Sequence, residues 1–177
     1  MASISYLNDD QIYLRTPEPE DIDIMYQIEN DTELWEVAAV TVPYSRYALK
    51  QYIANSSHDI FVDNQLRLMI VGKADNQIIG IIDLSDFDPL HNRAAVGVVI
   101  LNEYRKMGYA TRALKLLCDY SFGYLHLRQL YAYIPADNIS SIKLFNGQGF
   151  KESGLLKDWI RCDDNYKDAY LLQLIKE

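Results

Sequence analysis

Three residues at the spacing R-x-x-G-x-A, namely Arg105, Gly108 and Ala110, could form a binding site for a phosphate group. The glycine lets the backbone approach a ligand without a Cβ in the way, and the free N–H groups in the first turn of a helix bind anions. Arg105 and its neighbour Lys106 add two full positive charges. So short a pattern also occurs where a strand and a helix simply pack closely, so these residues alone leave both interpretations open.

Carboxylates and an aromatic residue form a second group of candidates, suited to a cationic ligand. Asp83 interrupts the apolar run IIGIIDL. A carboxylate in mid-strand lies on a wet face or lines a cavity, because burying it unpaired is costly. Glu33, Trp35 and Glu36 lie in one segment without a clean period, and together they could hold an ammonium by charge pairing and cation–π contact. The alternative is a solvated loop with Trp35 packed into the core.

The phosphate candidates need a strand that leads directly into a helix, and the sequence predicts both. Residues 96–101 are mostly β-branched or apolar, as in a strand that is buried on both faces. Beyond the turn, apolar residues recur with helical periodicity as far as Cys118. Asp83 lies on the second strand of a hairpin predicted over Leu66–Lys73 and Gln77–Ser85. Gly108 is therefore expected where the strand gives way to the helix.

The other predicted elements mix strands and helices. They are a strand over Ile12–Arg15, a helix that begins near Pro17, a break over Asn30–Pro43, a helix over Tyr44–Asn55, a strand over Gln129–Ile134, a short helix over Ser140–Gln148 and a closing pair of strands over Lys151–Ile160 and Asp168–Leu174. Such a mixture, with a hairpin at each end, fits an α/β layer design with a partly antiparallel sheet.

Length and composition indicate one globular domain. The chain has 177 residues, of which 49% are hydrophobic and 24% charged. We expect a single domain over residues 1–177, with residues 1–11 as an N-terminal extension. The formal net charge of −8 argues against a nucleic-acid partner and favours cationic ones, although acidic surfaces also serve solubility.

The sequence gives no clear signal for targeting, a membrane span or a metal site. No apolar run has the length of a membrane-spanning helix, and the N-terminus does not resemble a signal peptide, so we expect a cytoplasmic protein without a membrane partner. Neither Cys118 nor Cys162 has a histidine at metal-ligand spacing. We therefore expect no metal, and a structural role for both thiols.

The stretch around Arg105 resembles the pyrophosphate-binding segment of the GNAT superfamily of acetyl-CoA-dependent N-acetyltransferases, whose pattern is Q/R-x-x-G-x-G/A. A later block, NISSIKLFNGQGF, resembles the superfamily segment that closes over the pantetheine arm of the coenzyme. Two matching blocks in the right order are much more specific than one. From Ile12 to the C-terminus, the chain resembles most the branch that contains bacterial spermidine N-acetyltransferases and ribosomal-protein N-terminal acetyltransferases.

The resemblance implies a single GNAT-like α/β domain, a mixed and mostly antiparallel sheet flanked by helices, and a splay between the fourth and fifth strands. It implies acetyl-CoA as co-substrate. The residues that it implies for coenzyme binding are Val99, Ile100 and Leu101 on the central strand, Arg105, Lys106, Met107, Gly108, Tyr109, Ala110 and Thr111 at the turn and helix start, and Asn138, Ser141 and Phe145 in the later block.

The resemblance also implies where an acceptor amine binds. In the spermidine N-acetyltransferases the position of Asp83 carries a glutamate that faces the amine, which makes Asp83 the candidate catalytic and amine-binding carboxylate. Glu33, Trp35 and Glu36 belong to the segment that covers the acceptor side. A primary ammonium has a reference pKa of about 10, so a carboxylate or a water chain must accept its proton near neutral pH.

Two positions depart from the family pattern. Phe145 stands where the spermidine enzymes have a tyrosine as general acid, and Ala95 stands where many relatives have a glutamate. A phenyl ring cannot donate a proton, so water, Tyr109 or another tyrosine must protonate the thiolate.

Three functions therefore stay open. The chain is a transferase for a small amine such as spermidine, a transferase for a protein N-terminus, or a non-catalytic acetyl-CoA-binding module. A homo-oligomer is open as well.

Overall fold

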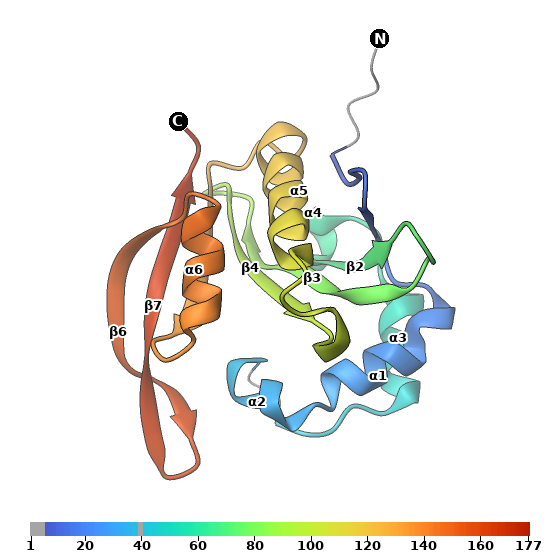
Figure 1. Ribbon diagram of the computed structural model, residues 1–177, viewed down its shortest axis with the longest axis horizontal. Helices are drawn as coiled ribbons and strands as arrows, with labels where there is room; N and C mark the ends of the chain where they lie inside the picture. Colours follow the sequence, from blue (N-terminus) through green and yellow to red (C-terminus); the bar gives the residue numbers. More distant parts are fainter. Residues whose placement is uncertain (1–5, 39–40) are drawn as a thin grey trace.

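One seven-stranded mixed sheet runs through the protein (Figure 1). The structure is a computed structural model that describes residues 6–38 and 41–177, without the side chains of residues 36–38. The strand order is β1-β2-β3-β4-β5-β7-β6. Within the described residues β4 and β5 are parallel, and the other neighbouring strands are antiparallel. The predicted α/β fold class is confirmed.

The bounds of the elements follow the sequence prediction closely in most places. The strands are β1 (Ile12–Arg15), β2 (Leu66–Gly72), β3 (Ile78–Asp88), β4 (Arg93–Ile100), β5 (Gln129–Pro135), β6 (Lys151–Cys162) and β7 (Asn165–Ile175). The helices are η1 (Pro19–Asp21), α1 (Ile22–Glu29), α2 (Thr32–Ala38), α3 (Arg46–Asn55), α4 (Ile60–Asp63), η2 (Asn102–Tyr104), α5 (Tyr109–Gly123) and α6 (Ile139–Gly147). In the described part of the chain, no helix is both long and apolar enough to cross a membrane.

The core consists of two hydrophobic clusters, one on each face of the sheet. Residues such as Ile82 and Leu114 join the inner strands to α5 and α6 on one face. Met69, on the other face of β2, packs with Met25 of α1 and Leu49 of α3. Successive side chains of a strand point to opposite faces of the sheet, so every second residue of β3 and β4 points to the face that α1 covers.

The break predicted over Asn30–Pro43 is wrong for its first half, where the chain forms α2. The Asp31 carboxylate starts this helix by accepting a hydrogen bond from the Glu33 N–H at 3.0 Å. The helix has seven residues, too few for an apolar period to repeat clearly. α4 is shorter still and begins in the same way, with Asp59 accepting from the Phe61 N–H at 2.9 Å.

A buried ion pair fastens the end of β1 to the beginning of α1. The Arg15 guanidinium donates to both carboxylate oxygens of Asp21, at 2.6 and 2.9 Å, and the Glu18 N–H donates to the same group at 2.8 Å. Asp21 is 5% exposed. Burial raises the pKa of Asp21, but the bonds from Arg15 and Glu18 outweigh it and hold that pKa below its usual value.

We expect Asp21→Asn to lower the free energy of unfolding by about 2–4 kcal/mol at neutral pH, because Arg15 loses its charged partner. Since the pKa of Asp21 is depressed in the folded protein, its contribution is complete above the unfolded value of about 3.9 and is lost as the pH falls through the folded value. Urea denaturation of wild type and variant should therefore converge toward acid pH. Asp23→Asn removes an exposed ion pair with Arg46 and should change the free energy of unfolding little at any pH. An equal loss at every pH would contradict this account.

Candidate active site

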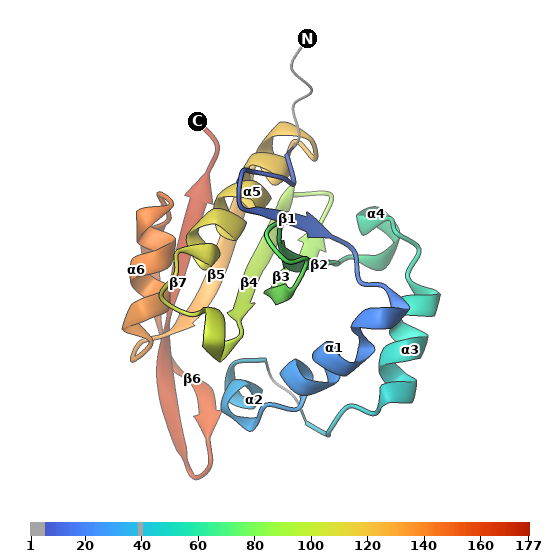
Figure 2. The same cartoon turned by 45° about the vertical axis from the view of Figure 1, so that its right-hand side comes forward.

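The sheet opens between β4 and β5. These strands pair over three residues, Arg93–Ala95 with Gln129–Tyr131, and the pairing then stops. β4 continues to Ile100 along β3, and β5 continues to Pro135 along β7, so the two strands diverge (Figure 2). The predicted splay between the fourth and fifth strands is confirmed.

The backbone N–H groups at the end of β4 divide between two directions. The Leu101 N–H donates to the Ile79 carbonyl at 2.9 Å. In an antiparallel ladder the inward and outward groups alternate, so the Val99 N–H also faces β3 and the Ile100 N–H faces the opening. Of the three candidate strand residues Val99, Ile100 and Leu101, it is thus Ile100 whose N–H faces the opening, while the Leu101 N–H is already bonded to β3. That the three residues bind the coenzyme stays a prediction.

The start of α5 has the geometry of an anion site. Gly108 is in the left-handed conformation at φ 84°, and a Cβ built there would meet nothing within 4 Å. The helix ladder begins with the Arg112 N–H, which donates to the Gly108 carbonyl at 3.2 Å. The preceding N–H groups of Tyr109, Ala110 and Thr111 belong to the first turn and have no acceptor inside the helix. They point out of its positive end.

The cationic side chains lie at the same junction. Arg105 is exposed and its Nε donates to the Ile100 carbonyl at 3.1 Å, which holds the side chain at the end of β4. Lys106 and Met107 are exposed beside it. The structure thus brings Ile100, Arg105 and the start of α5 together at the mouth of the splay, as the sequence predicts.

The later block begins a helix and then enters the core. Asn138 caps α6, its Oδ1 accepting from the Ser141 N–H at 3.1 Å and from the Ser140 hydroxyl at 3.0 Å. Phe145 is 3% exposed, and its ring meets that of Phe150 edge to face at 4.9 Å. The ring of Phe145 therefore belongs to the hydrophobic core on the α5–α6 face.

We expect Phe145→Tyr to leave kcat for coenzyme release unchanged and to lower the free energy of unfolding by about 1–3 kcal/mol, because its hydroxyl would be buried without a partner. Steady-state kinetics and thermal unfolding measure the two effects. Phe150→Tyr is the matched control, since Phe150 is fully buried in the same ring pair. A gain on the order of 10²-fold in kcat for Phe145→Tyr alone would show instead that the hydroxyl reaches the thiolate.

On the other face of the sheet, Asp83 is part of a three-residue ion cluster. Arg67 of β2 stands opposite Asp83 of β3, and its Nε and Nη2 donate to the two carboxylate oxygens at 3.0 and 2.8 Å. Its Nη1 donates to Glu29 at the end of α1. The side chains of Glu29, Arg67 and Asp83 are 12%, 23% and 28% exposed. Two carboxylates share one guanidinium, so the cluster carries a net charge of −1.

The three side chains of the cluster interact strongly with one another, and the sequence did not predict that they meet. Burial disfavours the charged guanidinium, but Asp83 and Glu29 outweigh this and raise the pKa of Arg67. The Tyr52 ring lies 5.8 Å from the same guanidinium, and burial raises the pKa of this phenol. Sequence reasoning found Asp83 and missed Glu29 and Arg67, whose partners are distant along the chain.

Of the three predicted residues on α2, Trp35 is bonded to the backbone at the end of α1. The Trp35 indole N–H donates to the Glu29 carbonyl at 2.9 Å, so α2 is fastened to the end of α1. Glu33 is exposed, and the side chain of Glu36 lies outside the described residues. α2 also contacts the edge strand β6.

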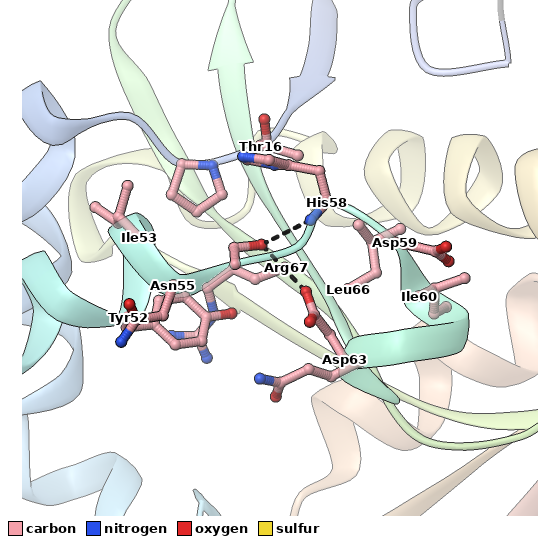
Figure 3. A pocket seen from close by; sticks show the side chains of 13 residues that line it. Thr16, Tyr52, Ile53, Asn55, His58, Asp59, Ile60, Asp63, Leu66 and Arg67 are labelled. Atoms are coloured by element: carbon pink, nitrogen blue, oxygen red, sulfur yellow. Dashed lines mark hydrogen bonds between the residues drawn. The ribbon is translucent and has the colours of Figure 1, made fainter.

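A cavity of about 190 Å³ lies at the corner of α3, α4 and the start of β2, and Arg67 and Tyr52 line it (Figure 3). None of the predicted site residues lines this cavity. Its carboxylates already hold the local fold, Asp59 as the cap of α4 and Asp63 through the Ser57 hydroxyl at 2.7 Å. No group of three or more His, Cys, Asp or Glu among the described residues could hold a metal ion.

Comparisons with known proteins cover nearly the whole chain. A family model described as acetyltransferase (GNAT) domain matches residues 11–151. The chain is 28% identical to an uncharacterized N-acetyltransferase p20 of Bacillus licheniformis over 168 residues, 94% of either chain. It is 27% identical to the spermidine N(1)-acetyltransferase of Escherichia coli (strain K12) over 158 residues, 89% of this chain and 82% of that one. It shares its fold with a spermidine N-acetyltransferase from Vibrio cholerae, solved in complex with CoA and spermine, at a TM-score of 0.83 and 22% identity over 94% and 96% of the two chains.

Proposed function

The chain belongs to the GNAT family of acetyltransferases, and we propose that it transfers the acetyl group of acetyl-CoA to a primary amine of a small molecule, a polyamine such as spermidine. As an N-acetyltransferase of this family it uses acetyl-CoA as co-substrate. The observation that carries the proposal is the end of the β4–β5 pairing at Ala95 and Tyr131, followed in the chain by the exposed helix start at Gly108.

The coenzyme half of the proposed site consists of backbone donors and two cations. Acetyl-CoA supplies the activated acyl group. The N–H groups at Tyr109–Thr111 would hold its pyrophosphate with Arg105 and Lys106, and the outward Ile100 N–H would polarise the thioester carbonyl. Holding both substrates in attack geometry can be worth on the order of 7–11 kcal/mol, so positioning supplies much of the catalysis.

The acceptor half is assigned to the ion cluster. Its net charge of −1 attracts an ammonium, and Asp83, the more exposed of its two carboxylates, would accept the proton directly or through a water. The polyamine class is supported by the relatives named spermidine N(1)-acetyltransferase and by the net charge of −8.

The experiment that tests the proposal measures coenzyme release when the protein is mixed with acetyl-CoA and a panel of amines and peptides. Turnover with spermidine or another small amine supports it. Turnover with peptide N-termini alone would replace it by a protein N-terminal acetyltransferase. Coenzyme binding without any turnover would leave a non-catalytic acetyl-CoA-binding module.

A further inference from the structure

Three aromatic side chains form a continuous surface on β5 and β6, which we call the aromatic wall: Tyr131, Tyr133 and Trp159. The rings of Tyr131 and Tyr133 lie 5.6 Å apart edge to face, and those of Tyr133 and Trp159 lie 5.7 Å apart. Tyr133 is 41% and Trp159 54% exposed. Large aromatic faces left open to solvent in a row are unusual unless they meet a partner.

The pairing of the strands places the wall on the acceptor side. Tyr131 pairs with Ala95 of β4, and paired residues point to the same face, so Tyr131 and Tyr133 face the same way as Gly97 and Asp83. The third ring, that of Trp159, lies at a bulge in β6. Between Leu156 and Ile160 the register with β7 shifts, and Trp159 is one of the unpaired residues inside this irregularity.

The wall borders the place where the strands separate. Tyr133 lies beyond the last pair between β4 and β5, and a Cβ built on Gly97, two residues past that pair on β4, would meet nothing within 4 Å. On the far side α2 packs against β6, next to the β6–β7 hairpin (Figure 2). The wall, the splay and the ion cluster thus surround one region of the sheet.

The charges around the wall favour a cation. Burial raises the pKa of Tyr131, and the nearby carboxylates of Asp86 and Asp88 raise it further while Arg93 lowers it. Two cations in this part of the described structure are paired with carboxylates, Arg93 with Asp88 at 3.1 Å and Lys157 with Asp168 at 2.8 Å. Aromatic faces attract ammonium groups, and more strongly when the contact excludes water.

We propose that the aromatic wall binds the second ammonium group and the alkyl chain of the acceptor, and so makes the protein selective for diamines and longer polyamines over amines with a single charge. The inference rests on the proposed function and states which acceptor amines the enzyme would select. The first amine group lies at the splay near Asp83, and the chain of the acceptor runs along β5 toward Trp159.

The test compares two acceptors of equal length, an α,ω-diaminoalkane and the corresponding amino alcohol, in Tyr133→Leu and Trp159→Leu variants. We expect kcat/KM for the diamine to fall about 5- to 30-fold in each variant, with little change for the amino alcohol and for KM of acetyl-CoA. Tyr124→Leu removes a ring that is 63% exposed and lies at the end of α5, and it should change neither. Equal losses for both acceptors, or none, would overturn the proposal.

A binding measurement separates this inference from the proposed function. The protein has two tryptophans, so the fluorescence that disappears in Trp159→Phe reports on the wall. We expect this component to change on titration with the diamine and not with the amino alcohol, whether or not turnover occurs. If the wild type shows this change but releases no coenzyme, the proposed function is disproved and binding by the aromatic wall is supported. If the wild type turns over diamines without the change, the proposed function is supported and binding by the aromatic wall is disproved.

Discussion

Gly108→Glu is expected to abolish acetyl-CoA binding while the protein stays folded. The side chain would leave the helix start into open space, where a Cβ meets nothing within 4 Å, and would place a carboxylate beside the N–H groups that are proposed to hold the pyrophosphate. Titration calorimetry should show the affinity falling by more than about 10²-fold, since the added carboxylate repels the pyrophosphate at close range. Circular dichroism should remain that of the wild type.

Two variants separate the charge from other effects. Gly108→Ala keeps the site neutral and adds the strain of a side chain at φ 84°, so it should cost about 1 kcal/mol of stability and little affinity. Gly147→Glu adds the same charge at an open position of α6 and should bind acetyl-CoA normally. If Gly108→Glu binds acetyl-CoA as the wild type does, the start of α5 is not the coenzyme site.

The coenzyme half was predictable because it is local. The strand β4, the turn after it and the helix α5 follow one another directly and carry their own signals, namely an apolar run, a glycine and a helical period. Chain connectivity then brings Ile100, Arg105 and Gly108 together. The splay was predictable from the resemblance alone, since nothing local in β4 says where its pairing with β5 ends.

The acceptor half could not be predicted from local signals, and a single residue shows why. The hairpin turn sets one register between β2 and β3, in which Val71 pairs with Ile78, but beyond Ile70 the pairing shifts and leaves Ile79 as an extra residue. Continuing the first register would put Arg67 opposite Ile82, on the wrong face. The bulge instead puts it opposite Asp83, where the bidentate ion pair forms.

The aromatic wall and α2 escaped prediction for related reasons. A bulge in β6 turns Trp159 toward Tyr133 of another strand. Exposed aromatic residues follow no periodic pattern in the sequence, so this contact could not be predicted. The Trp35 indole packs through a hydrogen bond to the Glu29 carbonyl, which belongs to the preceding helix. In each case the feature depends on two residues that are distant in the sequence or on different elements and that come into contact only in the folded protein.

The ion cluster yields the second large expected effect, a contrast between Asp83→Asn and Glu29→Gln. Each variant removes one negative charge from the same guanidinium partner and takes the cluster from −1 to neutral. Each should therefore raise KM for a cationic amine by about tenfold, since the attraction for the ammonium is lost. If Asp83 also accepts the proton of the amine, Asp83→Asn alone should lower kcat by about 10²-fold or more.

Steady-state kinetics with one diamine, at saturating acetyl-CoA, measures both parameters, and thermal unfolding of the two variants checks that they lose similar stability. The two variants are matched in charge and in their partner Arg67. They differ in position, since Glu29 is the less exposed carboxylate and comes from α1, whereas Asp83 lies on β3 opposite Gly97 of β4. A fall in kcat shared equally by both variants would mean that the cluster acts as one electrostatic unit and that the proton leaves through water or a phenol. Unchanged kinetics in both would reduce Arg67 and its carboxylates to a brace between β2, β3 and α1.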